Sequence, residues 1–332
     1  MRLTLQLLFF STLALATQAC AHNPTQIADF REFAVEMERK HGFTADEIEG
    51  LLSATKFRDD IIAAITRPAE SKAWHEYRPI FLKPDRIQGG VEFWQENEPL
   101  LDAVSQQYGV SPEIIVAIIG VETRYGRHTG RYRVIDSLTT LAFGYPKRAK
   151  FFRRELEEFL LLSREEQVDT DSAMGSYAGA MGKPQFISSS YRQYAVDHDG
   201  DGRRDLWNSD ADIIASVANY FKIHGWKTNQ PVTLRVEGGK QLQRFVEAGM
   251  KPSIKVEKIL ANGVRPVGDA SPNPQALTSL VKLDAGMQDE YWLGLHNFYV
   301  ITRYNHSNLY AMAAYQLSQE IRSAKQAAEV AR

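Results

Sequence analysis

The feature that most restricts the fold is the run SPEIIVAIIGVETRYG at positions 111–126. Ser111 followed by Pro112 is typical of a helix start, because serine caps the first turn and proline fits its first position. The residues after them are apolar on nearly every side, and such a helix is stable only inside a hydrophobic core. We therefore expect a helical domain built around this segment.

One carboxylate, Glu122, stands near the end of that helix. It shares a helix face with Ile114, Ile115, Ile118 and Ile119. Burial on such a face raises the pKa of a carboxyl group, so Glu122 can keep a proton near neutral pH and act as a general acid.

Glycines flank Glu122 on both sides. Gly120 and Gly126 carry no side chain, which predicts that a bulky ligand can approach the backbone there.

Two alternatives to catalysis stay open for Glu122. They are a place at the solvent end of the helix or an ion pair. The possible ion-pair partners are Arg124, Arg127 and Arg131.

Composition and local patterns indicate a mainly α protein (α+β) with a small antiparallel β insertion. The chain has 332 residues and a formal net charge of -2, which gives no indication of a nucleic-acid partner. Helical patterns cover residues 27–65, 91–108, 147–162, 209–224 and 308–328. Strand-like patterns cover residues 232–236, 277–283 and 291–301.

The first twenty residues predict a secretory signal peptide, because an apolar stretch is followed by small residues. Ala19-Cys20-Ala21 fits cleavage by a signal peptidase, whereas Thr17 to Cys20 resembles a lipobox in which Cys20 receives a lipid. We expect a periplasmic outer-membrane lipoprotein anchored through Cys20, and otherwise a soluble periplasmic protein. Cys20 is the only cysteine, which excludes a disulfide framework.

An acidic loop, DHDGDGRRDLWNSDAD at 197–212, predicts a calcium site. The expected ligands are Asp197, Asp199, Asp201, the carbonyl of Arg203 and Asp212. Asn208 stands where an EF-hand has its bidentate glutamate, so Asp210 or Asp212 must supply that ligand. With a single loop, a structural clamp is favoured over a sensor, and a solvated acidic turn is the alternative.

Five segments occur in one order: GVETRYGR, GSYAGAMGKPQF, DHDGDG, SVANYFKIHGW and NFYVITRYN. Together they resemble the membrane-bound lytic transglycosylase B family of murein lytic transglycosylases (glycoside hydrolase family 103). The resemblance extends from Tyr77 to Leu317. It implies a lysozyme-like core with a helical domain, a small β domain and structural Ca²⁺ in an EF-hand-like loop, without an organic cofactor.

The resemblance also implies the reaction and the site. The family cleaves the β-1,4 bond between N-acetylmuramic acid and N-acetylglucosamine in peptidoglycan without water, forming 1,6-anhydromuramic acid ends. Its catalytic glutamate matches Glu122. Its substrate-binding residues match Ser176, Gln185, Tyr77, Tyr220, Tyr299, Tyr304, Lys147 and Arg148.

We predict five segments along the chain. They are a signal peptide (1–20), an N-terminal helical domain (21–110), the catalytic core with its EF-hand-like loop (111–226), the β domain (227–296) and a C-terminal return to the core (297–332). The expected partners are peptidoglycan glycan strands and other cell-wall enzymes, and the expected state is a monomer.

Two other functions are compatible with the residues. A hydrolytic muramidase needs a second carboxylate, for which Asp136 is a candidate. A calcium-stabilised murein-binding scaffold needs no acid at all, and Glu122 argues against it.

Overall fold

The computed structural model describes residues 24–67, 72–239, 242–268 and 270–330. The chain divides into two compact units, Met1–Phe57 and Arg58–Arg332. The predicted signal peptide and Cys20 lie outside the described residues. Within the described ranges, no helix is both long and apolar enough to cross a membrane.

The first unit contains helices α1 (Pro24–His41) and α2 (Ala45–Ser53). They pack through buried side chains that include Phe33, Met37 and Leu52. Thr44 caps the second helix, since its Oγ1 accepts the N–H of Glu47 at 3.2 Å.

The second unit begins with α3 (Asp59–Thr66), α4 (Trp74–Phe81), α5 (Pro84–Glu96) and α6 (Glu98–Tyr108). The prediction of one helix over 91–108 is wrong, because the chain leaves helical geometry at Asn97. Pro99 explains the break: proline has no N–H to continue the ladder and fits only the first turn of a new helix. The predicted domain boundary at residue 110 stays a prediction.

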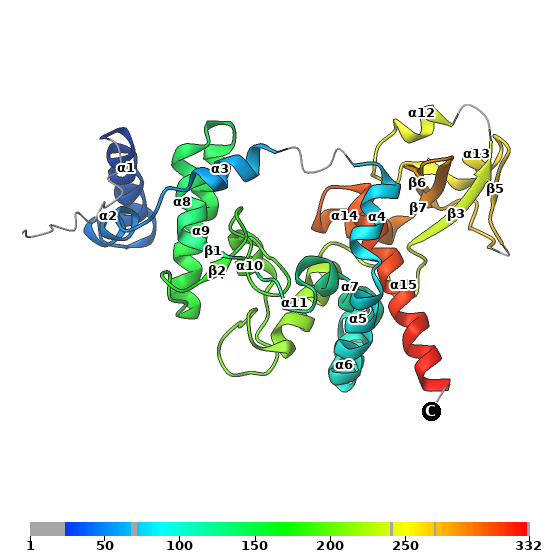
Figure 1. The fold of residues 1–332 in the computed structure, drawn as a ribbon, viewed down its shortest axis with the longest axis horizontal. Helices are drawn as coiled ribbons and strands as arrows, with labels where there is room; N and C mark the ends of the chain where they lie inside the picture. Colours follow the sequence, from blue (N-terminus) through cyan, green and yellow to red (C-terminus); the bar gives the residue numbers. More distant parts are fainter. Residues whose placement is uncertain (1–23, 68–71, 240–241, 269, 331–332) are drawn as a thin grey trace, which may run out of the picture. The chain divides into compact units, whose positions relative to one another are not determined.

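Helix α7 (Pro112–Thr123) lies at the centre of the second unit. Every side chain from Ile114 to Val121 is buried. It packs against α5, α6, α11 (Asp210–Ile223) and the long C-terminal helix α15 (Asn308–Val330), which lies beside it in Figure 1. The expectation that this apolar segment forms the core is confirmed.

A second group of elements in this unit spans residues 132–194. It contains β1 (Tyr132–Arg133), α8 (Val134–Gly144), the 3-10 turn η1 (Pro146–Arg148), α9 (Ala149–Glu166), β2 (Met174–Gly175) and α10 (Ser188–Tyr194). β1 and β2 form a two-stranded antiparallel sheet, and α9 packs against α8 and α10.

The predicted β insertion is an antiparallel sheet of five strands in the order β4-β6-β7-β3-β5. Its elements are β3 (Thr233–Gly238), α12 (Gln243–Val246), β4 (Ile254–Lys255), α13 (Val256–Leu260), β5 (Val264–Pro266), β6 (Leu277–Asp284) and β7 (Asp289–Gly294) (Figure 1). Leu280 faces Leu293 across β6 and β7, and both belong to a separate buried cluster with Val256 and Ile259. The insertion therefore has its own small core, and the mainly α class is confirmed.

The strand predicted over 291–301 is wrong beyond Gly294, because residues 296–304 form helix α14 (His296–Tyr304). Its β-branched and aromatic residues favour a strand only weakly, and burial of one helix face outweighs that preference. Asn297 fixes the start: its Nδ2 donates to the carbonyls of Lys227 (2.8 Å) and Gln230 (3.1 Å), and its Oδ1 accepts the Lys227 N–H (2.9 Å).

Candidate active site

Glu122 lies in the last turn of α7 and keeps only part of its surface accessible. Burial raises the pKa of Glu122 to about 7 from an ordinary value of 4.5, and a hydrogen bond from Tyr310 opposes this shift. The Tyr310 hydroxyl donates to Glu122 Oε1 at 2.5 Å. Among the described residues, no basic side chain forms an ion pair with Glu122, so the predicted environment of a general acid is present.

The chain turns sharply directly after Glu122. Arg124 and Tyr125 have φ values of 51° and 61°, in the left-handed region, and Gly126 follows at 87°. The Tyr125 hydroxyl donates to the carbonyl of Arg86 at 2.8 Å, which ties this turn to α5. The turn stops the helix and leaves Glu122 at its end.

The space beside the two flanking glycines is already filled, contrary to the prediction that a ligand approaches there. A Cβ on Gly120 would lie 2.5 Å from the Tyr125 hydroxyl oxygen, and one on Gly126 would lie 2.8 Å from Lys183 Cε. Both glycines therefore allow close packing within the protein itself.

Tyrosines from four helices gather near Glu122. The rings of Tyr304 and Tyr310 stack 6.4 Å apart, and Tyr220 lies 4.8 Å from Tyr304. Burial, with Glu122 close by, holds the pKa values of Tyr304 and Tyr310 well above the ordinary value, and Tyr77 contributes to the shift of Tyr310. These hydroxyls stay neutral, so they donate hydrogen bonds without adding charge to the site.

The segment Lys183–Gln185 runs past the turn that follows Glu122. Tyr304 donates its hydroxyl to the carbonyl of Pro184 at 2.6 Å. Gln185, at a φ of 53°, donates from Nε2 to the carbonyls of Thr129 and Gly182, each at 3.0 Å. The structure therefore brings Gln185 to the same region as the tyrosines.

Ser176 has a local contact of its own. Its Oγ accepts the N–H of Ala180 at 3.0 Å and so closes the glycine-rich loop after β2. This contact gives the hydroxyl a role in the shape of the loop.

Three predicted substrate residues line cavities whose walls do not include Glu122. Tyr299 lines a cavity of about 740 Å³ between the β insertion and the start of α14. Lys147 and Arg148, in η1, line another cavity of about 380 Å³, and the Arg148 guanidinium lies 4.2 Å from the ring centre of Phe151. Among the described residues, none of these three side chains contacts Glu122.

The acidic loop brings three carboxylates together. Donor oxygens of Asp197, Asp199 and Asp212 lie within 4.8 Å of one another. Asp212 is buried in the first turn of α11, and its carboxylate accepts the N–H groups of His198 (2.7 Å) and Asp205 (2.8 Å). Of the two residues considered for the last ligand, Asp212 joins this group.

The other predicted ligands have different contacts. The Asp201 carboxylate accepts the N–H of Arg203 at 2.9 Å and lies outside the group of three. Asn208 donates from Nδ2 to Asp205 Oδ2 at 2.9 Å, so it closes the loop where an EF-hand has its glutamate. Asp201 and the Arg203 carbonyl as metal ligands stay predictions.

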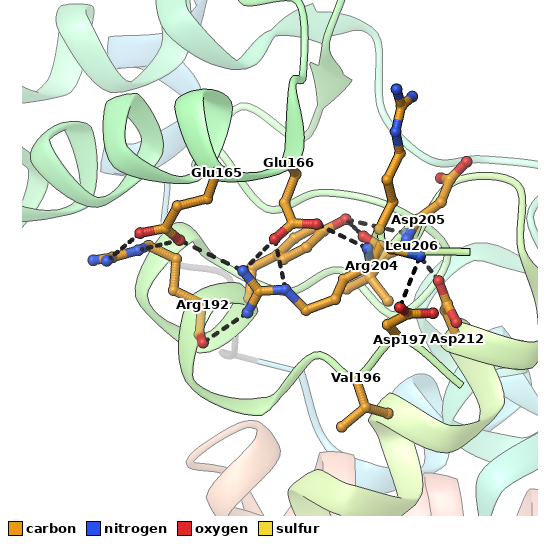
Figure 2. A network of polar contacts seen from close by, with 12 residues as sticks. Glu165, Glu166, Arg192, Val196, Asp197, Arg204, Asp205, Leu206 and Asp212 are labelled. Atoms are coloured by element: carbon orange, nitrogen blue, oxygen red, sulfur yellow. Dashed lines mark hydrogen bonds and ion pairs between the residues drawn. The ribbon is translucent and has the colours of Figure 1, made fainter. Parts of the chain in front are cut away.

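A polar network not predicted from the sequence attaches this loop to the end of α9 (Figure 2). The Glu166 carboxylate accepts two hydrogen bonds from Arg204, one from the backbone N–H at 2.8 Å and one from the side-chain Nε–H at 2.7 Å. Arg204 Nη1 donates to the carbonyl of Arg192 at 3.1 Å, and Arg192 Nη2 lies 2.6 Å from Glu165. Charge-assisted bonds with two donors to one carboxylate are strong, so the loop is firmly oriented.

The acidic group has the donor chemistry of a hard cation. Its ligand atoms are carboxylate oxygens, which Ca²⁺ prefers. In the part of the chain that the structure describes, no lysine or arginine forms an ion pair with Asp197, Asp199 or Asp212. A divalent cation fits this set because it neutralises their mutual repulsion.

Asp136, the candidate for a second catalytic carboxylate, is buried on α8. It forms an ion pair with Arg133 Nη2 at 3.2 Å. Within the described ranges, no carboxylate contributes to the pKa shift of Glu122. Asp136 therefore has a structural partner, and the part of the chain that the structure describes shows no carboxylate facing Glu122 of the kind that a hydrolase needs.

Tyr310 contacts Glu122 but was not predicted from the sequence. It lies 188 residues from Glu122 in the chain, on a helix whose residues could be predicted but whose neighbours could not. The local sequence NLYAMAAY contains no signal that separates Tyr310 from an ordinary core tyrosine.

Residues 26–319 match the family described as the transglycosylase SLT domain. The chain is 44% identical over 315 residues to membrane-bound lytic murein transglycosylase B of Escherichia coli K12, covering 92% of this chain and 84% of the relative.

Solved structures resemble the whole fold. Soluble lytic transglycosylase SltB1 of Pseudomonas aeruginosa has a TM-score of 0.85 at 48% identity, over 90% of this chain and 99% of that one. Escherichia coli lytic transglycosylase Slt35 in complex with calcium has a TM-score of 0.81 at 44% identity, over 91% and 94%. Pseudomonas aeruginosa SltB3 in complex with NAG-anhNAM-pentapeptide has a TM-score of 0.78 at 31% identity, over 89% and 79%.

Proposed function

The chain belongs to the transglycosylase SLT family, and from that premise we propose how its residues cleave peptidoglycan. It is a lytic murein transglycosylase with a lysozyme-like fold, as its relatives at 44–48% identity are. The bond cleaved is the β-1,4 link between N-acetylmuramic acid and N-acetylglucosamine, and the product ends in 1,6-anhydromuramic acid. The complex of SltB3 with an anhydro-muramyl ligand supports this product.

Glu122 acts first as the acid. With a pKa of about 7, a large fraction of its carboxyl groups carry a proton near neutral pH. The proton passes to the glycosidic oxygen as the bond from C1 of N-acetylmuramic acid to that oxygen breaks. Proton transfer of this kind contributes about 10²–10⁴-fold to the rate.

Glu122 then acts as the base. The N-acetyl group of the substrate stabilises the positive charge that develops at C1. The Glu122 carboxylate takes the proton of the C6 hydroxyl, and O6 attacks C1 to close the anhydro ring. The carboxyl group ends protonated as it began, so one residue serves both steps and no water is consumed.

The tyrosines and Gln185 form the surroundings of this reaction. We assign Tyr77, Tyr220 and Tyr304 to the walls of the glycan groove, because aromatic faces pack on sugar rings. Tyr310 orients the carboxyl group through its hydrogen bond to Oε1. Ser176, Tyr299, Lys147 and Arg148 are assigned to more distant parts of the strand and its peptides.

A hydrolytic muramidase and a non-catalytic scaffold fit less well. The observation that carries the proposal is Glu122, a desolvated acid at the end of α7 whose pKa is raised to about 7, without a facing carboxylate among the described residues. Retaining and inverting hydrolases need such a pair, and a scaffold has no use for an acid with a raised pKa.

Calcium is proposed as a structural cofactor. Asp197, Asp199 and Asp212 would hold the ion, completed by Asp201 and the carbonyl of Arg203. The related Slt35 was solved in complex with calcium. When bound, the ion neutralises the carboxylates and stiffens the loop that leads into α11.

The proposed location is the periplasm, with a lipid anchor on Cys20, because the relative in Escherichia coli is membrane-bound. Glycan strands of peptidoglycan are the proposed ligand, and association with other cell-wall enzymes and a monomeric state stay predictions.

The test of the reaction is digestion of bacterial sacculi by the purified protein, followed by mass spectrometry of the soluble products. We expect muropeptides lighter by one water than the hydrolysed forms. Fully hydrated products with reducing ends would indicate a muramidase, and binding without products would indicate a scaffold.

A further inference from the structure

Lys183 lies where three parts of the core meet. Its backbone N–H donates to the carbonyl of Leu206, in the acidic loop, at 2.8 Å. Its carbonyl accepts the hydroxyl of Thr123, the residue after Glu122, at 2.8 Å. Its ammonium Nζ lies 2.6 Å from Asp210 Oδ1, in the first turn of α11. A single residue thus connects the acidic loop, the start of α11 and the end of α7.

The turn that directly follows the end of α7, next to the residue that Lys183 contacts, is under backbone strain. Arg124 and Tyr125 both have positive φ values, 51° and 61°. Such a conformation is unfavourable for a non-glycine residue and persists only where the surroundings enforce it. The strained residues follow Glu122 directly, so whatever enforces the turn also sets the position of the carboxyl group.

Lys183 supplies much of that enforcement. The Thr123 hydroxyl donates to the backbone carbonyl of Lys183. It also accepts the N–H of Gly126 at 3.1 Å, and this second bond closes the turn. The methylene groups of Lys183 fill the space beside Gly126, where an added Cβ would lie 2.8 Å from Cε. The Lys183 side chain is 19% exposed and the Asp210 side chain 36%, so their ion pair is partly shielded from solvent.

We propose that Lys183 is a positioning residue, which fixes the strained turn after Glu122 against the acidic loop and α11 and so sets the depth of the Glu122 carboxyl group. The inference rests on the proposed function, in which Glu122 is the acid. It concerns how the carboxyl group is held and adds no chemical step.

The test compares Lys183→Met, which keeps the methylenes and removes the charge, with Lys183→Arg, which keeps a cation. For Lys183→Met we expect kcat to fall about tenfold with KM within about twofold, because misplacement of an acid affects the chemical step. We expect Lys183→Arg to keep most of the activity. The matched control is Lys282→Met, which removes an ion pair of 2.9 Å with Asp289 in the β insertion.

A second measurement does not depend on activity. The pKa of Glu122 is measured by ¹³C NMR of glutamate-labelled protein, with Glu122→Gln used for assignment. In Lys183→Met the turn relaxes and admits water, so we expect the pKa to move from about 7 toward 4.5. Lys282→Met should leave it unchanged.

The outcomes separate this inference from the proposed function. Wild-type kcat together with an unshifted Glu122 pKa in Lys183→Met overturns the inference, and so does an equal loss in Lys282→Met. If wild-type protein makes no anhydro product but Lys183→Met still shifts the Glu122 pKa, the positioning role stands and the proposed function fails.

Discussion

At the scale of single residues, Glu122 places function and stability in opposition. Its carboxyl group titrates at about 7 in the folded protein and near 4.5 when exposed. Between these pH values the folded state binds more protons than the unfolded state. The contribution of Glu122 to stability therefore decreases as pH rises from 4.5 to 7.

Replacing Glu122 by glutamine should lower kcat by about 10²–10⁴-fold while leaving glycan binding intact. The same variant should be more stable than wild type at pH 8, by roughly 1–3 kcal/mol, because the buried charge is gone. Urea unfolding at pH 4 and pH 8 measures the second effect. If the free energy of unfolding of the wild-type protein does not fall relative to that of the variant between pH 4 and pH 8, the raised pKa is contradicted.

Replacing Tyr310 by phenylalanine should raise the pKa of Glu122 further. The Tyr310 hydroxyl donates to the ionised carboxylate, which lowers the pKa, so its loss favours the protonated form. The alkaline limb of kcat/KM should then move to higher pH. Tyr315→Phe, on the same helix, is the control, and a limb that moves to lower pH would show that Tyr310 acts in another way.

At the scale of elements, two connections orient the site. One is the acidic loop before α11, attached to α9 through Arg204 and Glu166. The other is the start of α14, where Asn297 joins the helix to residues 227–230. Each places a tyrosine of the proposed groove, Tyr220 on α11 and Tyr304 on α14.

Removal of calcium should lower the melting temperature. An ion at 100 times its Kd stabilises the folded state by about 2.7 kcal/mol. Differential scanning calorimetry with and without chelator measures the shift. Asp212→Asn should abolish the calcium effect, whereas Asp289→Asn in the β insertion should retain it. A melting temperature that calcium does not change excludes the structural clamp.

Asn297→Ala should destabilise the protein by about 2–4 kcal/mol, because it removes three hydrogen bonds that the fully buried Asn297 side chain makes to the backbone of Lys227 and Gln230. Denaturant unfolding measures the change. Asn262→Ala, at a half-buried position in the same unit whose side-chain hydrogen bonds lie at the surface, serves as the control and should cost less. Equal effects of the two substitutions would count against Asn297 as the fixed point of α14.

At the scale of the whole molecule, the chain combines a helical core with a β insertion that has its own buried cluster. The N-terminal segment before the described residues adds the proposed anchor. Fold class and family could be predicted from motifs spread along the chain, and both are confirmed.

Cys20→Ala should release the protein from membranes. Wild-type protein expressed with its signal should incorporate labelled fatty acid and fractionate with the outer membrane. The variant should lack the label and appear in the soluble periplasmic fraction. An unlabelled wild-type protein would favour cleavage at the A-x-A pattern instead.

Features that depend on neighbouring residues could be predicted from the amino-acid sequence. Helix periodicity and capping around Pro112 predicted a buried helix with Glu122 at its end, and the spacing of Asp197 and Asp199 predicted an acidic loop. Propensity failed at residues 296–304, where burial of one face made a helix from residues typical of a strand.

Only the tertiary structure decided which groups meet. Tyr310 reaches Glu122 across 188 residues, and Lys183 meets Thr123 across 60. Local sequence specifies periodicity and turn chemistry over a few positions, whereas the partner of a buried polar group depends on which distant faces pack together. That packing sets both the pKa of Glu122 and the strained turn that holds it.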